Sequence, residues 1–252
     1  MSASSQPLSP EPLVYVPVSG NPRQLFVLLH GGGAAPAQVE ALDKAIKQHF
    51  PDALVVLPYG AYPDGKGAYH WFKQQGLDES NYVGRVHEAL PELVAYIRLV
   101  QAKYGLSGEH TALAGFDQGA TIALEASLLH SDLAGRVLAF SGCYAQLPSM
   151  APPATTLHLF HGADDPIIPV NDIRFMHSHL ADLQGDATLD IGSRIGHELH
   201  EALIRQAIYR LQTCIPLRSW QAALSGLEQE GDQDQDDNDT EADDKKAPPT
   251  LH

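Results

Sequence analysis

Short, continuous apolar runs recur along most of this chain and alternate with longer stretches in which apolar side chains return every third or fourth position. Continuous apolar runs are typical of strands that are covered on both faces. They predict strands at 13–18, 24–30, 53–58, 110–115, 135–140, 156–161 and 187–191. The longer stretches predict helices at 36–49, 81–104, 118–130, 170–182 and 198–213.

The helical period is clearest between 81 and 104, where one stripe is formed by Val83, Val86, Leu90, Leu93, Val94, Ile97 and Val100. Strands that alternate with helices predict an α/β fold with a mostly parallel central sheet and helices on both of its faces. The longest irregular stretches, 60–80 and 142–154, are too short to form a large cap domain.

The composition changes along the chain and predicts its organisation. Residues 1–11 are rich in Ser and Pro and are predicted to be a flexible lead-in to one domain at 12–216. A short helix is possible at 217–227. Ten acids and two lysines lie between 228 and 246, a net charge of −8 out of −15 for the whole chain. With almost no apolar side chains, 228–252 is predicted to be a disordered acidic tail.

Charge and cysteine usage exclude several classes of function. Nucleic-acid binding requires clustered Lys and Arg, so the acidic charge of this chain argues against it. The same charge argues against binding to an anionic membrane surface. No apolar run is long enough for stable membrane insertion, and the first residues do not resemble a signal peptide, so we expect a cytoplasmic protein. Cys143 and Cys214 suggest neither a disulfide framework nor a metal site. We expect no metal and no cofactor, and the sequence predicts no oligomeric state.

The most informative segment for chemistry is Gly115-Phe-Asp117-Gln-Gly119, which follows a predicted strand and precedes a predicted helix. This is the context of a nucleophile elbow, in which a tight turn aims one side chain into the cleft above a sheet. Alone, the pattern is weak, because Gly-x-Asp-x-Gly also occurs in ordinary loops.

Three further segments strengthen the elbow. His30-Gly-Gly-Gly ends an earlier strand, and its N–H groups, with that of Gln118, suit an oxyanion hole. Asp165, in His-Gly-Ala-Asp-Asp-Pro, follows a late strand, and His197 follows the last one. Each segment by itself also has a simpler interpretation, as an ordinary loop or turn. Their order, elbow then Asp then His, is the order of the α/β-hydrolase fold.

These motifs resemble the phospholipase/carboxylesterase family of α/β-hydrolases, relatives of acyl-protein thioesterases, and in particular its small bacterial esterases. The resemblance extends from about residue 13 to the end of the last helix and rests on Leu29-His-Gly-Gly, Trp71-Phe72, Gly-Phe-x-Gln-Gly-Ala, His-Gly-x-x-Asp-Pro and Gly-His. It implies hydrolysis of a small-molecule ester, of the short-chain or lysophospholipid type.

The resemblance also assigns roles to individual residues. It makes Asp165 and His197 the members of a catalytic triad and the N–H groups of Gly32 and Gln118 the oxyanion hole. Trp71 and Phe72 would line the acyl pocket. The family's elbow reads Gly-Phe-Ser-Gln-Gly, and here the nucleophile position holds Asp117 instead of serine.

An aspartate at the elbow removes the hydroxyl on which ester hydrolysis of this kind depends. Attack by the Asp117 carboxylate on an ester would have to form an anhydride, and it has no proton to pass to His197. One of its oxygens is expected to rest in the oxyanion hole, and His197, between two carboxylates, is expected to stay protonated. Losing the nucleophile of such a triad typically costs about 10⁶-fold in turnover. We expect esterase activity near background.

Two alternatives remain open from the sequence. Haloalkane dehalogenases and epoxide hydrolases use an elbow Asp that attacks saturated carbon, but they need leaving-group stabilisers, often a Trp directly after the Asp, and position 118 is Gln. The other alternative is a non-catalytic module that retains the acyl-binding pocket.

Overall fold

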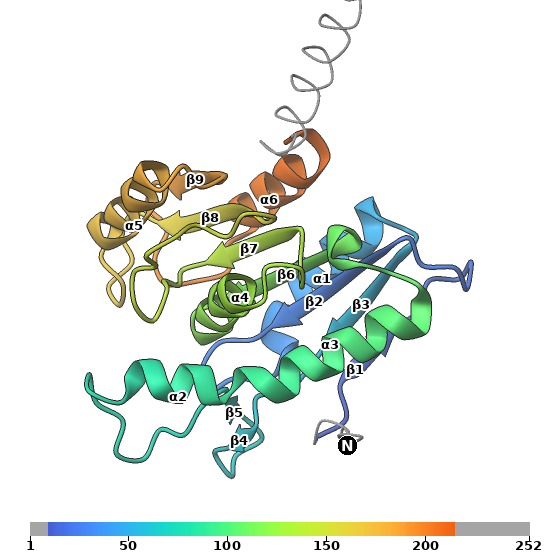
Figure 1. The fold of residues 1–252 in the computed structure, drawn as a ribbon, viewed down its shortest axis with the longest axis horizontal. Coiled ribbons are helices and arrows are strands. Elements are labelled where there is room, and N and C mark those ends of the chain that lie inside the picture. Colours follow the sequence, from blue (N-terminus) through green and yellow to red (C-terminus); the bar gives the residue numbers. More distant parts are fainter. Residues whose placement is uncertain (1–9, 215–252) are drawn as a thin grey trace, which may run out of the picture. The chain divides into compact units, whose positions relative to one another are not determined.

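A central sheet organises the part of the chain that the computed structural model describes, residues 10–214. Within those residues it has seven strands in the order β1-β3-β2-β6-β7-β8-β9 (Figure 1). Strand β1 runs antiparallel to β3 at one edge, and the other neighbours pair in parallel. The strands are β1 Leu13–Tyr15, β2 Gln24–Leu29, β3 Ala53–Leu57, β6 Thr111–Phe116, β7 Arg136–Phe140, β8 Thr156–Gly162 and β9 Ala187–Gly192.

Helices cover both faces of the sheet. Successive side chains of each strand point to opposite faces, so each strand contributes to a core on either side. In β2, Leu25 and Val27 belong to the core beneath α2, α3, α4 and α5, whereas Phe26 and Leu28 belong to the core beneath α1 and α6 (Figure 1). The predicted fold class is therefore confirmed. The helices are α1 Glu40–His49, α2 Tyr82–Glu88, α3 Leu90–Tyr104, α4 Gln118–Leu129, α5 Val170–Asp182 and α6 Glu201–Thr213.

Two predicted helices differ from the structure in their continuity. The stretch 81–104 is not one helix, since it divides at Ala89 into α2 and α3. Pro91 lies in the first turn of α3, where its missing N–H is tolerated and where it would break a helix arriving from α2. The stretch 36–49 begins as a 3₁₀ turn, η1 (Pro36–Val39), before α1.

The irregular stretch 60–80 contains a two-stranded sheet that the apolar pattern did not predict, formed by β4 (Tyr62–Pro63) and β5 (Tyr69–His70). Strands of two residues are too short to produce an alternation of apolar and polar positions. Tyr69 also bridges to Ala34, so this hairpin packs on the loop that follows β2. The segment is a brace for that loop and forms no cap domain.

The described residues lie in one compact unit, which ends at Cys214. The limits of the predicted domain, 12 and 216, stay predictions, as does the lead-in at 1–11, of which only the last two residues are described. The predicted helix at 217–227 and acidic tail at 228–252 lie outside the described residues. No helix between residues 10 and 214 is long and apolar enough to cross a membrane.

Candidate active site

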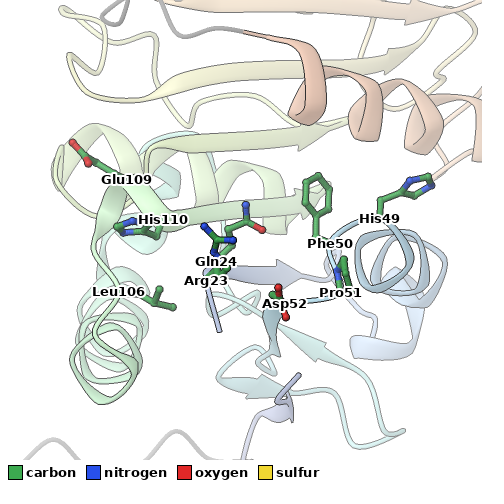
Figure 2. Close-up of a pocket in the computed structure, with 9 residues that line it drawn as sticks. All are labelled: Arg23, Gln24, His49, Phe50, Pro51, Asp52, Leu106, Glu109 and His110. Atoms are coloured by element: carbon green, nitrogen blue, oxygen red, sulfur yellow. The ribbon is translucent and has the colours of Figure 1, made fainter. Parts of the chain in front are cut away.

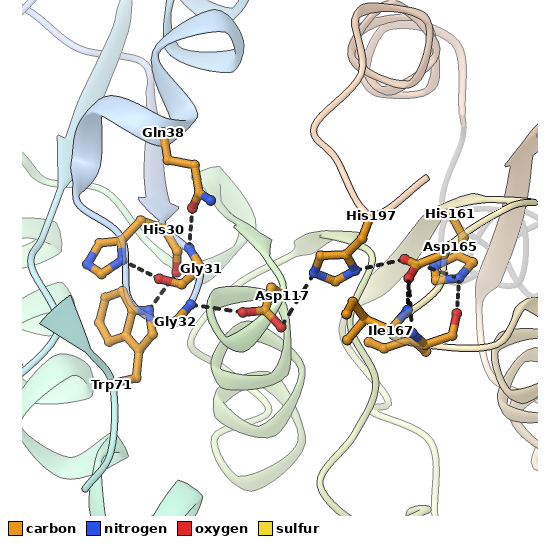
Figure 3. A network of polar contacts seen from close by, with 11 residues as sticks. His30, Gly31, Gly32, Gln38, Trp71, Asp117, His161, Asp165, Ile167 and His197 are labelled. Carbon is orange, nitrogen blue, oxygen red and sulfur yellow. Dashed lines mark hydrogen bonds and ion pairs between the residues drawn. The ribbon is translucent and has the colours of Figure 1, made fainter. Parts of the chain in front are cut away.

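The predicted site segments meet at one edge of the sheet, where the parallel strands have their carboxyl ends. Gly32 follows β2, Asp117 follows β6, Asp165 follows β8 and His197 lies between β9 and α6. Figure 3 shows the side chains of Asp117, His197 and Asp165 in one row that begins at the backbone of Gly32. Residues separated by as many as 85 positions are thereby in hydrogen-bond contact.

The elbow is a strained turn between β6 and α4. Asp117 has φ 52° and ψ −119°, a left-handed region that side chains other than glycine rarely occupy. Its two glycines allow close backbone approach. A Cβ on Gly115 would lie 2.2 Å from the carbonyl carbon of Gly119, and a Cβ on Gly119 would lie 2.3 Å from the carbonyl oxygen of Leu29. Both obstacles are backbone atoms, so the turn requires glycine at both positions.

Replacing Gly119 by alanine is therefore expected to destabilise the protein, by about 3 kcal/mol on the scale of overpacked sites. The added methyl group would force α4 away from β2. Urea unfolding followed by circular dichroism measures the loss. The matched control is Gly84→Ala in α2, where a Cβ meets no atom within 4 Å and alanine is the better helix former by up to about 1 kcal/mol. Equal stability of the Gly119→Ala variant and the starting protein would contradict this packing.

Asp165 is an oriented carboxylate directly behind His197. Its Oδ2 is 2.8 Å from His197 Nδ1, and its Oδ1 accepts the backbone N–H groups of Ile167 and Ile168 at 2.8 and 3.0 Å. Burial raises the pKa of Asp165, but these two N–H groups and His197 outweigh it, so the pKa lies below its usual value. Asp165 is therefore ionised at neutral pH and suited to hold the Nδ1 proton of His197.

Asp117 lies on the other side of His197. Its Oδ2 accepts the N–H of Gly32 at 2.9 Å, and its Oδ1 is 3.8 Å from His197 Nε2 (Figure 3). One carboxylate oxygen thus rests on a predicted oxyanion-hole donor, as the sequence led us to expect. The imidazole is flanked by two carboxylates, one on each ring nitrogen.

Gln118, the residue after the elbow, begins helix α4. Its side chain packs against Gly32, and its Oε1 accepts the backbone N–H of Trp71 at 3.3 Å. The oxyanion-hole role assigned to its own N–H stays a prediction. The side chain has a separate effect, because it ties the elbow to the segment that carries Trp71.

Trp71 and Phe72 are more enclosed than residues of an open pocket wall. Their exposed fractions are 3% and 1%, and both belong to the core beneath α3 and α4. Trp71 Nε1 donates to the carbonyl of His30 at 2.7 Å, and Phe72 packs edge-on against Tyr82. The contact of Trp71 and Phe72 with acyl chains stays a prediction. In the structure, Trp71 supports the glycine loop through its hydrogen bond to His30.

Three further histidines are hydrogen-bonded in strands or at their ends. His30 Nε2 accepts the N–H of Gly60 at 3.0 Å, and His158 Nδ1 is 2.8 Å from the hydroxyl of Thr188. His161 Nε2 is 2.9 Å from the carbonyl of Ile168. Burial lowers the pKa of His161, so this ring is neutral and donates to that carbonyl. Among residues 10–214, no three His, Cys, Asp or Glu side chains gather as a metal site would require.

The site also depends on residues that the motifs did not reveal. The N–H groups of Ile167 and Ile168 hold Asp165, and Gln38 Oε1 accepts the N–H of Gly31 at 2.6 Å. Backbone donors have no sequence signal, and Gln38 lies in an exposed turn without a recognisable pattern.

A separate cavity of about 620 Å³ lies at the opposite edge of the sheet, at the amino ends of β2, β3 and β6 (Figure 2). Strand β6 runs from one edge to the other. His110, which lines the cavity, precedes the first residue of β6, and Asp117 follows the last. The cavity's cationic and acidic side chains, among them Arg23, Asp52 and Glu109, do not favour a ligand of either sign. It has no part in the site at Asp117.

Comparison with known proteins supports the family that the motifs resemble. A sequence model of the family described as phospholipase/carboxylesterase matches residues 14–215. The chain is 39% identical over 205 residues to Esterase YpfH of Escherichia coli (strain K12), a match that covers 81% of this chain and 88% of that protein.

Solved structures share the architecture. The crystal structure of esterase PE8 superposes with a TM-score of 0.73 at 28% identity, covering 81% of this chain and 98% of that one. The Bacillus cereus carboxylesterase superposes with a TM-score of 0.68 at 15% identity, covering 81% and 94%, which speaks for the fold alone.

Proposed function

Because this chain belongs to the phospholipase/carboxylesterase family, we propose that its site is a carboxylic-ester hydrolase site whose nucleophile position is occupied by Asp117. In this proposal the chain turns over esters at a rate near background. Its ligands are small-molecule esters or acyl compounds, of the short-chain or lysophospholipid type, and the chemistry needs no cofactor. We place the protein in the cytoplasm.

The remaining machinery keeps its roles in this proposal. Asp165 orients His197 and stabilises its protonated form, and the N–H groups of Gly32 and Gln118 form the oxyanion hole. Trp71 and Phe72 form the acyl side of the cleft. Of these assignments, the pairing of Asp165 with His197 has the strongest support, from the contact of 2.8 Å and from the ionised carboxylate.

One observation carries the proposal, namely the position of the Asp117 carboxylate between Gly32 and His197. A serine in the elbow presents a neutral hydroxyl, and His197 would accept its proton as the hydroxyl attacks the ester carbonyl. An ionised carboxylate has no proton to give, and its attack on the carbonyl would form an anhydride. It also occupies an N–H group that the tetrahedral oxyanion would need.

The direct test is an assay of the purified chain, as it is, on p-nitrophenyl acetate and butyrate. We expect rates at the level of a mock purification. Turnover that survives size-exclusion chromatography, and that co-elutes with the chain at constant specific activity, would overturn the proposal.

The same contact favours a second candidate, a hydrolase in which Asp117 itself is the nucleophile. With Oδ2 held by the N–H of Gly32, Oδ1, 3.8 Å from His197 Nε2, is the oxygen that would attack a saturated carbon. The attack would expel a halide, or open an epoxide whose oxygen takes a proton from water. The resulting alkyl ester on Asp117 would then be cleaved by water that His197 deprotonates. That water attacks the carboxyl carbon, releases the alcohol and restores the carboxylate.

Halide release from bromoalkanes and ring opening of styrene oxide, each followed with the purified chain, test this candidate. A single turnover in H₂¹⁸O would place one ¹⁸O atom in the Asp117 carboxylate, which peptide mass spectrometry detects. The matched control is Asp117→Asn, which has no carboxylate to alkylate. Without product and without label, this second candidate is excluded.

A further inference from the structure

The loop that carries the Gly32 N–H consists of three consecutive glycines, Gly31 to Gly33, and its conformation is held by side chains from elsewhere. Glycine loses more backbone freedom on ordering than any other residue, so such a loop does not keep one shape by itself. We propose that Gln38 is a positioning residue of the oxyanion hole, which acts by clamping the backbone of this loop. The inference rests on the proposed function, in which the Gly32 N–H stabilises the oxyanion.

The clamp acts on one peptide unit, the one that joins His30 to Gly31. Its N–H is donated to Gln38 Oε1 at 2.6 Å, and its carbonyl oxygen accepts Trp71 Nε1 at 2.7 Å (Figure 3). Held at both ends, the plane of this peptide cannot rotate. Both hydrogen bonds are at or below the short end of the usual 2.7–3.2 Å range for such contacts.

Gln38 reaches this position from the 3₁₀ turn η1, which directly follows the glycine loop. Its amide oxygen and the elbow residue both lie close to Gly31. A Cβ built on Gly31 would be 3.0 Å from Gln38 Oε1 and 3.3 Å from the Cβ of Asp117. The glutamine therefore takes up the N–H of Gly31 close to the reacting position and leaves the N–H of Gly32 to face residue 117.

The next peptide unit is held as well, since the carbonyl of Gly31 is 2.7 Å from His30 Nδ1. His30 is buried, and the unit that it holds is joined directly to the unit that Gln38 clamps, so the position of the Gly32 N–H depends on both. Oxyanion stabilisation depends on donor position, and a misplacement of about 1 Å costs on the order of 10² in rate. Gln38 itself is exposed, so its replacement leaves the core intact.

The test uses three changes, each made both in the chain as it is and in the Asp117→Ser variant. Gln38→Leu removes the acceptor, and Gln38→Glu keeps an acceptor oxygen at the same distance along the side chain. Gln48→Leu is the matched control, since Gln48 is an exposed glutamine of α1 whose side chain makes no hydrogen bond to the residues that the structure describes. The readouts are the NMR shift and exchange rate of the Gly31 amide, and kcat and KM for p-nitrophenyl acetate.

We expect Gln38→Leu to move the Gly31 amide proton upfield and to speed its exchange at least tenfold, with or without the serine. In the serine background, Gln38→Leu should lower kcat by 10- to 100-fold with KM changed less than threefold. Gln38→Glu should keep the amide protected and recover most of kcat, and Gln48→Leu should change nothing.

The amide readout separates failure of this inference from failure of the proposed function. If the serine variant is inactive but Gln38→Leu releases the Gly31 amide, the proposed function fails and the clamp stands. If the amide of Gln38→Leu stays protected, or if kcat of an active serine variant is unchanged by it, the inference is overturned.

Discussion

Replacing Asp117 by serine is expected to raise the turnover of p-nitrophenyl acetate by about 10⁵- to 10⁶-fold, the factor by which loss of the nucleophile lowers turnover in a related triad. The contacts that the proposed mechanism requires are present, because Asp165 is 2.8 Å from His197 Nδ1 and the N–H of Gly32 points at residue 117. Removal of the carboxylate frees that N–H for the oxyanion and leaves His197 free to accept the proton of the hydroxyl.

Initial rates on acetate and butyrate esters, measured with both proteins from the same purification, give the comparison. The matched control is Asp117→Asn, which removes the charge and keeps the size but supplies no hydroxyl. If Asp117→Asn is as active as the serine variant, the charge of Asp117 and not the missing hydroxyl limits the reaction. Equal rates for the starting chain and the serine variant would contradict the role given to residue 117.

In the serine background, Asp165→Asn is expected to lower kcat by about 10⁴-fold, as the corresponding change does in a serine protease triad. Asparagine can turn its NH₂ group toward His197 Nδ1, which forces the imidazole proton onto Nε2, the nitrogen that must accept the proton of the serine. The pKa of Asp165 lies below its usual value, so the starting carboxylate is ionised throughout the neutral range and the loss should be seen across that range.

The neighbouring carboxylate provides the control for this second prediction. Asp164 is exposed, and its side chain makes no hydrogen bond or ion pair within residues 10–214. Asp164→Asn should therefore change kcat by less than twofold. A large loss in Asp164→Asn combined with a small one in Asp165→Asn would move the triad acid to position 164.

Local patterns predicted the order of strands and helices well, and they failed where an element is very short or where a helix breaks beneath a continuous apolar stripe. The apolar runs located all seven strands of the main sheet. Five of them, β2, β3, β6, β7 and β8, are buried along most of their length, which requires an unbroken apolar run. The break at Ala89 was missed, because the apolar stripe continues through it and only Pro91 signals the new start. The hairpin β4–β5 was missed, because strands of two residues are too short to show an alternation of apolar and polar positions.

The sequence alone determined which residue stands at the elbow, and the proposed loss of esterase chemistry follows from that residue. The elbow has a local signature, since two glycines flank residue 117 between a predicted strand and a predicted helix, and the identity of Asp117 is read directly. The linear order of Asp117, Asp165 and His197 was enough to indicate the fold family.

Only the tertiary structure determined that the Asp117 carboxylate accepts the N–H of Gly32. It also determined that Gln38 and Trp71 hold the loop that carries this N–H. Gly32 and Asp117 are 85 positions apart, and Trp71 is 41 positions from the His30 carbonyl that it holds. Contacts of this kind depend on the order of strands in the sheet and on backbone N–H directions. Every residue type has the same backbone N–H, proline excepted, so no pattern of side chains along the chain announces them.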